Sequence, residues 1–127
     1  MQMMARDSDP HEVRAAMADV LPWLAGTADQ PARATLARAV RLSLRVLPAI
    51  APGRSVEVRV PPFAAVQCVP GPRHTRGTPP NVIETDPRSW LELATGRLSW
   101  TDAVAGGRVT ASGSRADIAG LLPVVRM

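Results

Sequence analysis

The first apolar side chains of the sequence recur at helical spacing and form one stripe: Val13, Met17, Val20, Leu21 and Leu24. Just before them, Asp9-Pro10-His11-Glu12 combines a capping side chain, a proline suited to the first helical position and an acid. The pattern therefore predicts a helix from Pro10 toward Gly26, with Pro22 kinking or shortening its end.

A second helix is predicted from Pro31 to about Leu47, and Pro48 and Pro52-Gly53 are expected to end it. One side of this helix is apolar and includes Leu36, Val40, Leu44 and Leu47. The opposite side carries Arg38, Arg41 and Arg45, spaced by three and four residues. Such a stripe is typical of a solvated face, and the alternative is a face that meets a membrane surface or an acidic partner.

The hydrophobic period then changes from helical to alternating. Val56, Val58 and Val60 alternate with Glu57 and Arg59, which predicts a half-buried strand. We expect three more strands over residues 63–69, 81–85 and 108–113, with Val66 and Cys68 on one face of the second and Val109 and Ala111 on one face of the last.

Helix-start signals follow at Asp86-Pro87 and at Ser99, with stops at Gly96 and Gly106-Gly107. Ser114 is predicted to cap a last helix that continues through Leu122. This order of helices and strands indicates an α+β fold. We expect residues 1–8 to form a disordered tail and residues 9–127 one domain, with a helical pair at 9–50 and a sheet with helices at 54–127.

Composition narrows the class of protein. Of the 127 residues 46% are hydrophobic, yet no run approaches the roughly 20 apolar residues of a membrane-spanning helix. The first residues lack the apolar segment of a signal peptide. One cysteine and two histidines form neither an internal disulfide nor a Cys/His zinc site. We therefore expect a cytoplasmic protein without a metal, a cofactor or stable membrane insertion.

All fifteen basic residues are arginine, and the net charge is +4. Because lysine is absent, Schiff-base and lysine-base chemistry are excluded. Nucleic acid is not an expected partner, since aromatic residues make up only 3% of the chain and no basic recognition helix is evident.

The sequence also lacks the familiar catalytic motifs. Cys68 could act as a nucleophile with His74 as its base, but it lies in an apolar strand, where a buried, inert thiol is the common case. Ser112 and Ser114 lie outside any triad pattern. We therefore do not expect an enzyme.

The last third of the chain carries a family resemblance. Residues 86–98 read DPRSWLELATGRL, and a short helix, the strand GRVTASG at 107–113 and a leucine-rich segment follow. This order resembles the sterol carrier protein type 2 (SCP-2) domain over residues 31–123, most specifically over 84–122. The sequence looks like the actinobacterial "sterol carrier family protein" branch in three features: its arginine-rich composition, Pro61-Pro62 and the run RHTRGTPP at 73–80.

The resemblance implies an α+β fold with a mostly antiparallel sheet of four to five strands and helices packed on one face. An apolar cavity between them would hold a sterol, a fatty acyl chain or acyl-CoA. The candidate wall residues, each of which could instead be plain core, are Phe63, Val66, Val82, Trp90, Leu91, Leu93, Trp100, Val104, Leu121 and Leu122.

The proline-rich stretch 70–80 joins two predicted strands and should lie at an end of the sheet. Its Arg73, His74 and Arg76 could grip an anionic head group. The plainer interpretation is an ordered connector in which Arg76 pairs with Glu84 or Glu57.

Two functional hypotheses follow. The first is a non-catalytic lipid-binding or lipid-transfer protein of sterol-carrier type. The second is an interaction or structural module of the same fold with a filled core, for which a homodimer is the simplest form.

Overall fold

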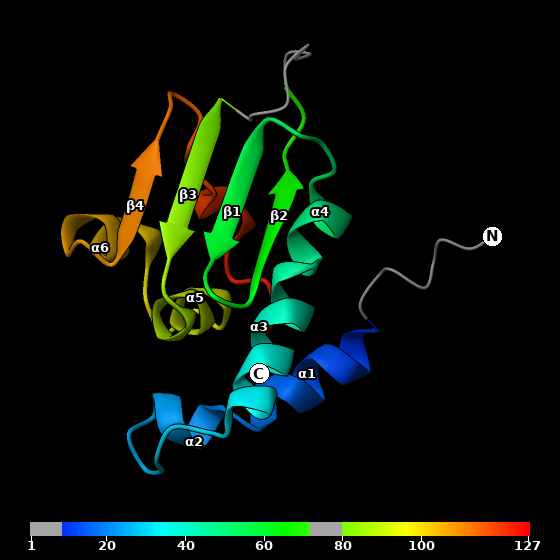
Figure 1. Cartoon of the computed structure of the whole chain (residues 1–127), viewed down its shortest axis with the longest axis vertical. Helices are drawn as coiled ribbons and strands as arrows, with labels where there is room; N and C mark the ends of the chain where they lie inside the picture. The colour runs from blue at the N-terminus through cyan, green and yellow to red at the C-terminus, as the bar shows by residue number, and fades with distance from the viewer. Residues whose placement is uncertain (1–8, 72–79) are drawn as a thin grey trace.

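A computed structural model describes residues 9–71 and 80–127, which form one sheet packed against helices (Figure 1). The predicted tail 1–8 and residues 72–79 of the proline-rich stretch lie outside the described residues. Within the described ranges, no helix is long and apolar enough to cross a membrane.

The first predicted helix is two elements, α1 (Pro10–Ala18) and α2 (Leu21–Leu24). Asp9 caps α1 as predicted, since its carboxylate accepts a hydrogen bond from the His11 backbone N–H at 2.9 Å. The break after Ala18 has a local cause. Pro22 has no N–H to donate to the Ala18 carbonyl, and its ring occupies the space that this carbonyl would need.

The second predicted helix is divided in the same way, into α3 (Arg33–Leu44) and α4 (Val46–Ile50). The prediction of one continuous helix to about Leu47 is wrong, although helical structure does end at Ile50, just before the predicted stop at Pro52-Gly53. Leu44 is four residues before Pro48, so the α-helix stops there and Pro48 lies inside the next short helix. The three arginines of the predicted stripe are exposed on α3 and at the junction, as expected.

Four strands form the sheet: β1 (Val56–Val60), β2 (Ala64–Cys68), β3 (Asn81–Thr85) and β4 (Val109–Ser112). Their order is β2-β1-β3-β4. The outer pairings, β1 with β2 and β3 with β4, are antiparallel, whereas the central pairing of β1 with β3 is parallel. The sheet is therefore mixed, and the α+β class is confirmed.

The central parallel pairing follows from where the proline-rich stretch begins and ends. Cys68 and Asn81 are both in register with Val56, so β2 ends and β3 begins at the same end of the sheet. Because β2 and β3 lie on either side of β1 and β3 begins at the end of the sheet where β2 stops, β3 runs parallel to β1. The prediction that this stretch lies at a sheet end is confirmed for its described flanks.

The alternating pattern gives the sheet one apolar face. Val56, Val58 and Val60 are fully buried, as is Cys68, while Arg59 and Glu84 on the other face are exposed. The apolar face packs on α3, α4, α5 (Pro87–Ala94) and the segment around the 3₁₀ turn η2 (Ala119–Leu121) (Figure 1). This arrangement agrees with helices on one face of the sheet.

Two of the three later helix predictions are confirmed. Asp86 caps α5 by accepting from the Ser89 backbone N–H at 3.0 Å. Ser99 caps α6 (Trp100–Ala105) by accepting from the Asp102 N–H at 3.1 Å. Both caps satisfy backbone donors that a helix start leaves without partners.

The predicted last helix from Ser114 to Leu122 is wrong, because only η2 forms there. The Arg115 backbone N–H donates to the Asn81 side-chain oxygen at 2.8 Å, which ties this segment to β3 instead. Gly113, at φ 102°, permits the turn, and a Cβ there would lie 2.3 Å from the same Asn81 oxygen.

Trp90 of α5 is the largest fully buried side chain of the described residues. Its indole N–H donates to the Ser43 hydroxyl of α3 at 2.9 Å, and that hydroxyl donates to the Ala39 carbonyl at 2.6 Å. Leu91 and Leu93 beside it are also buried. The space between α3, α5 and the sheet is thus filled by packed side chains with satisfied polar groups.

Trp90→Ala should lower the free energy of unfolding by about 3–5 kcal/mol, because it leaves a cavity and removes the donor to Ser43. Urea unfolding followed by far-UV circular dichroism measures this change. Val104→Ala, at a position that is 45% exposed, is the control and should change stability by less than about 0.5 kcal/mol. A Trp90→Ala cost as small as the control's would contradict the packing described here.

Candidate functional site

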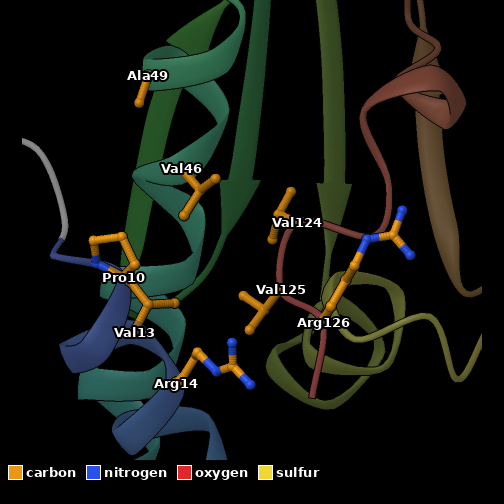
Figure 2. A pocket seen from close by; sticks show the side chains of 8 residues that line it. All are labelled: Pro10, Val13, Arg14, Val46, Ala49, Val124, Val125 and Arg126. Atoms are coloured by element: carbon orange, nitrogen blue, oxygen red, sulfur yellow. The ribbon is translucent and has the colours of Figure 1, made fainter.

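A cleft of about 250 Å³ lies between α1, α4 and the extended segment that follows η2 (Figure 2). Three stretches far apart in the sequence supply its lining. The residues are Pro10, Val13 and Arg14 of α1, Val46 and Ala49 of α4, and Val124, Val125 and Arg126 of the extended segment.

Each apolar side of the cleft is positioned by a different feature of the local structure. In α4, Val46 and Ala49 are three residues apart and so share one helix face. On the opposite side, the Val124 and Val125 backbone N–H groups both donate to the Ala94 carbonyl, at 3.0 and 3.1 Å. This carbonyl lies at the end of α5, so the helix anchors the extended segment as a wall of the cleft.

Two arginines give the cleft a cationic rim. Arg14 and Arg126 are exposed, and the guanidinium group of neither forms a hydrogen bond or an ion pair with a described residue. Arg14 reaches from α1 toward the extended segment, whereas the Arg126 side chain leaves that segment on the side away from α1 (Figure 2). Because arginine stays protonated, the site combines apolar walls with two permanent positive charges.

None of the ten predicted wall residues lines this cleft. Trp90, Leu91 and Leu93 are buried core, and Val104 is exposed on α6. Val82 is half-buried on β3, in register with Glu57 and Ser112. The other five are half-buried against the core: Phe63, Val66, Trp100, Leu121 and Leu122. The predicted head-group residues Arg73, His74 and Arg76 lie outside the described residues.

Sequence reasoning missed the cleft because its residues are close only after folding. Val46 had a helical apolar pattern as its signal, and Val13 belonged to the first stripe. The positive charge of Arg14 next to Val13 was visible, but nothing in the sequence placed it opposite Arg126. The extended course of residues 122–125 was hidden by the helix predicted to run up to Pro123.

Cys68 is fully buried on β2, and burial raises the pKa of its thiol to about 11. The thiol therefore stays protonated at neutral pH and is a poor nucleophile. This agrees with the prediction of an inert cysteine. The histidine considered as its base, His74, lies outside the described residues.

The backbone next to Cys68 is strained. Val69 has φ 71°, which is rare for a β-branched residue. Its N–H donates to the Ala51 carbonyl at 2.6 Å, and its own carbonyl accepts from the N–H and the hydroxyl of Ser55, at 3.1 and 2.9 Å. Gly53 allows this close approach, since a Cβ there would lie 2.2 Å from the Val69 oxygen. The start of the proline-rich stretch is thereby fixed against β1.

A cluster of polar side chains joins α5 to α2 and to Arg108, the residue just before β4. The Ser89 hydroxyl donates to Asp86 at 2.6 Å and accepts from Arg108 Nε at 2.8 Å. Glu92 accepts from Arg108 and from Arg88, and Arg88 also donates to the Leu24 carbonyl at 3.3 Å. Each of these side chains is therefore engaged by its neighbours, which is the pattern of a structural cluster.

The pKa of Asp86 is lowered below its ordinary value of 3.8. Burial acts in the opposite direction and raises it, but hydrogen bonds from the side chain and backbone of Ser89 and the charge of Arg108 outweigh burial.

Among the described residues, no group of three or more His, Cys, Asp or Glu side chains could hold a metal ion.

Asp86→Asn keeps a capping side chain but removes the charge. Because the folded-state pKa is lowered, the charge stabilises the protein fully above the ordinary pKa, and this contribution is lost as pH falls through the folded value. Wild type should therefore exceed the variant in unfolding free energy at about pH 6, and the difference should shrink below about pH 3.5. Urea unfolding across this pH series measures it, and a difference independent of pH would contradict the assignment.

Comparison with known proteins identifies the domain. A family model described as a bacterial SCP ortholog matches residues 32–124, which is well over half of the chain. Comparison with curated protein sequences gives no match. The matched range agrees with the sterol-carrier resemblance of residues 31–123, and it includes the sheet, α3 to α6 and η2. The chain therefore belongs to the family of bacterial orthologs of the sterol carrier protein.

Proposed function

We propose that this protein is a non-catalytic carrier that binds a lipid in the cleft between α1, α4 and the extended segment. The observation that supports this most directly is the cleft itself. Five of its eight lining residues are alanine or valine, and it opens beside the packed core of a sterol-carrier-family domain. Apolar walls with a few polar groups at the edge are the usual composition of a lipid or small-molecule site.

The size of the cleft favours a single chain over a rigid ring system. Sites for drug-sized ligands usually enclose about 300–1,000 Å³. At about 250 Å³ this cleft lies just under that range. An acyl chain can place part of its length in such a space and gain roughly 0.8 kcal/mol for each buried methylene. A sterol would need more enclosed volume to be sheltered to the same degree.

A carrier role without catalysis fits the chemistry of the site. The eight lining residues include no carboxylate, histidine, cysteine or hydroxyl side chain. Arginine is a poor general base because it holds its proton at working pH. The site can thus bury an apolar group and attract a negative one, which supports binding of a ligand rather than its chemical conversion.

One observation favours a second candidate, an interaction module with a filled core. The predicted wall residues Trp90, Leu91 and Leu93 are core side chains with at most 1% exposure. A filled core leaves the exposed apolar groups of α4 and α6, Ile50 and Val104, as contacts for another protein. A homodimer remains its simplest form.

Native mass spectrometry of the purified protein, incubated with dodecanol, dodecanoate or a sterol, tests the carrier proposal. We expect a one-to-one adduct with the single-chain lipids. Ala49→Trp should weaken it at least about tenfold by filling the cleft. Ala34→Trp, at an exposed alanine of α3 that is not part of the lining, is the matched control and should bind as wild type does.

Two results would overturn this proposal. The first is the absence of any lipid adduct, combined with a solution mass that rises with concentration, which would favour the interaction module. The second is equal loss of binding in both tryptophan variants, which would place the lipid elsewhere.

A further inference from the structure

We propose that the outer edge of β4 is the contact surface for a second copy of this chain, and that two copies join their sheets by antiparallel pairing of their β4 strands. This inference goes beyond the carrier proposal and does not depend on it, because the cleft is formed by α1, α4 and the extended segment. It also gives the alternative function, an interaction module, a specific surface.

The outer edge of β4 has no partner among the described residues. β4 is the last strand in the order β2-β1-β3-β4 and pairs with β3 on one side only. Beyond that ladder, its four residues form no hydrogen bond with a described residue. Alternate backbone N–H and C=O groups of an edge strand point away from its neighbour. β4 therefore offers a row of donors and acceptors with which another strand can pair.

The exposure of β4 agrees with an open edge. Thr110, Ala111 and Ser112 are all exposed, although successive side chains of a strand point to opposite faces. Thr110 is in register with the exposed Glu84, whereas Ala111 is in register with the buried Ile83. Figure 1 places β4 at the outer edge of the sheet, with α6 near the end where the strand begins. The apolar face of the sheet is therefore left uncovered at Ala111.

The opposite edge of the sheet, β2, is covered. α3 and α4 contact this strand and lie beside it (Figure 1). Just before β2, the Phe63 carbonyl accepts from Arg41 Nε of α3 at 3.2 Å. Just after it, the Val69 N–H donates to the carbonyl of Ala51, the residue that follows α4, at 2.6 Å. One edge of the sheet is thus protected by helices, and the other is left for pairing.

The sequence of β4 lacks the side chains that usually keep an edge strand from pairing. Natural edges are often protected by charged residues or proline. β4 reads Val109-Thr110-Ala111-Ser112 and contains neither, in a chain of which 20% is charged. The nearest charge in sequence, Arg108, is held by Ser89 and Glu92 of its own chain. Two copies can therefore approach along this edge without opposing free charges.

A second copy matches both faces of this edge. A two-fold axis perpendicular to the sheet makes the two β4 strands antiparallel and keeps the helices of both copies on one side. We assign the register that sets Thr110 opposite its own counterpart, a favourable cross-strand pair. Val109 then lies opposite Ala111 of the other copy, so the apolar face continues across the contact. α6, which contacts β4, adds Val104, 45% exposed, as a further apolar group near it.

Sedimentation velocity over about 5–500 µM protein tests the surface. A contact built on one four-residue strand per copy is smaller than the roughly 1,200–2,000 Å² of a stable complex, so we expect a weak dimer that forms toward the upper concentrations. Ala111→Lys sets a charge against Val109 of the other copy and should weaken the dimer at least about tenfold. Ala34→Lys adds the same charge at an exposed position of α3 and should associate as wild type does.

Oxidative cross-linking tests the register. Thr110→Cys should give a disulfide-linked dimer, because the two Cβ atoms face each other beside the two-fold axis. Ser112→Cys, in the same strand, should not, since the two cysteines would be displaced along the strands by roughly 13 Å. Wild type, whose Cys68 is fully buried, gives the background.

Each outcome supports or overturns a defined part of this inference. A monomeric mass over the whole concentration range, without cross-linking of Thr110→Cys, overturns the dimer. Undiminished association of Ala111→Lys overturns the β4 surface, and so does an equal loss in Ala34→Lys, which would reduce the effect to net charge. Cross-linking of Ser112→Cys in place of Thr110→Cys overturns the register.

The carrier proposal is tested separately with the same variants. Ala111→Lys lies outside the lining of the cleft, so its adduct with dodecanoate should match that of wild type. A weaker adduct in this variant would overturn the independence of the two surfaces. If wild type forms no lipid adduct, the carrier proposal fails and the dimer inference stands.

Discussion

The burial of Trp90 between α3 and the sheet is the constraint on which the rest of the structure depends. The indole fills the space at the centre of the domain, and its single donor is satisfied by Ser43. In a small domain most apolar residues are needed for the domain's own stability. With the centre filled, space for a ligand remains at the edge of the core, where α1, α4 and the extended segment meet.

Two prolines divide the predicted helices, and the second of them bears on the cleft. Pro22 and Pro48 each follow by four residues the last residue of a regular helix, Ala18 and Leu44. Each break turns one predicted helix into a long and a short piece. The piece after Leu44 is α4, which presents Val46 and Ala49 to the cleft. The same ring chemistry that ends a helix thus creates one wall of the candidate site.

Much of the fold could be predicted from the sequence. The alternation of Val56, Val58 and Val60 predicted the buried face of β1, and the capping residues Asp9, Asp86 and Ser99 marked helix starts. These signals are local, since they depend on spacing and on side chains that bond nearby backbone groups. The parallel pairing of β1 with β3 is not local. It depends on β3 beginning at the end of the sheet where β2 stops but on the other side of β1, and no local pattern in the sequence reveals that placement.

The candidate site could not be predicted from the sequence for the same reason: it depends on contacts between residues far apart in the chain. The backbone N–H of Arg115 bonds to Asn81, 34 residues earlier, and this long-range bond replaces the helix that Ser114 was predicted to begin. The extended segment that follows is what brings Val125 toward Val13 and α4. Neither Arg14 nor Arg126 has a neighbour in sequence that would mark it as part of a binding site. Only the folded chain places their charges beside the same apolar walls.

The anchoring of the extended segment bears on how quickly the cleft can exchange its contents. Two amides, those of Val124 and Val125, hold this wall to a single carbonyl at the end of α5. Opening the wall requires those two bonds to break, while the sheet and the Trp90 core stay intact. Local opening of this kind costs far less than global unfolding. Opening of this wall is therefore separable from the stability of the domain, and under the proposed function it is the step that would admit or release a lipid.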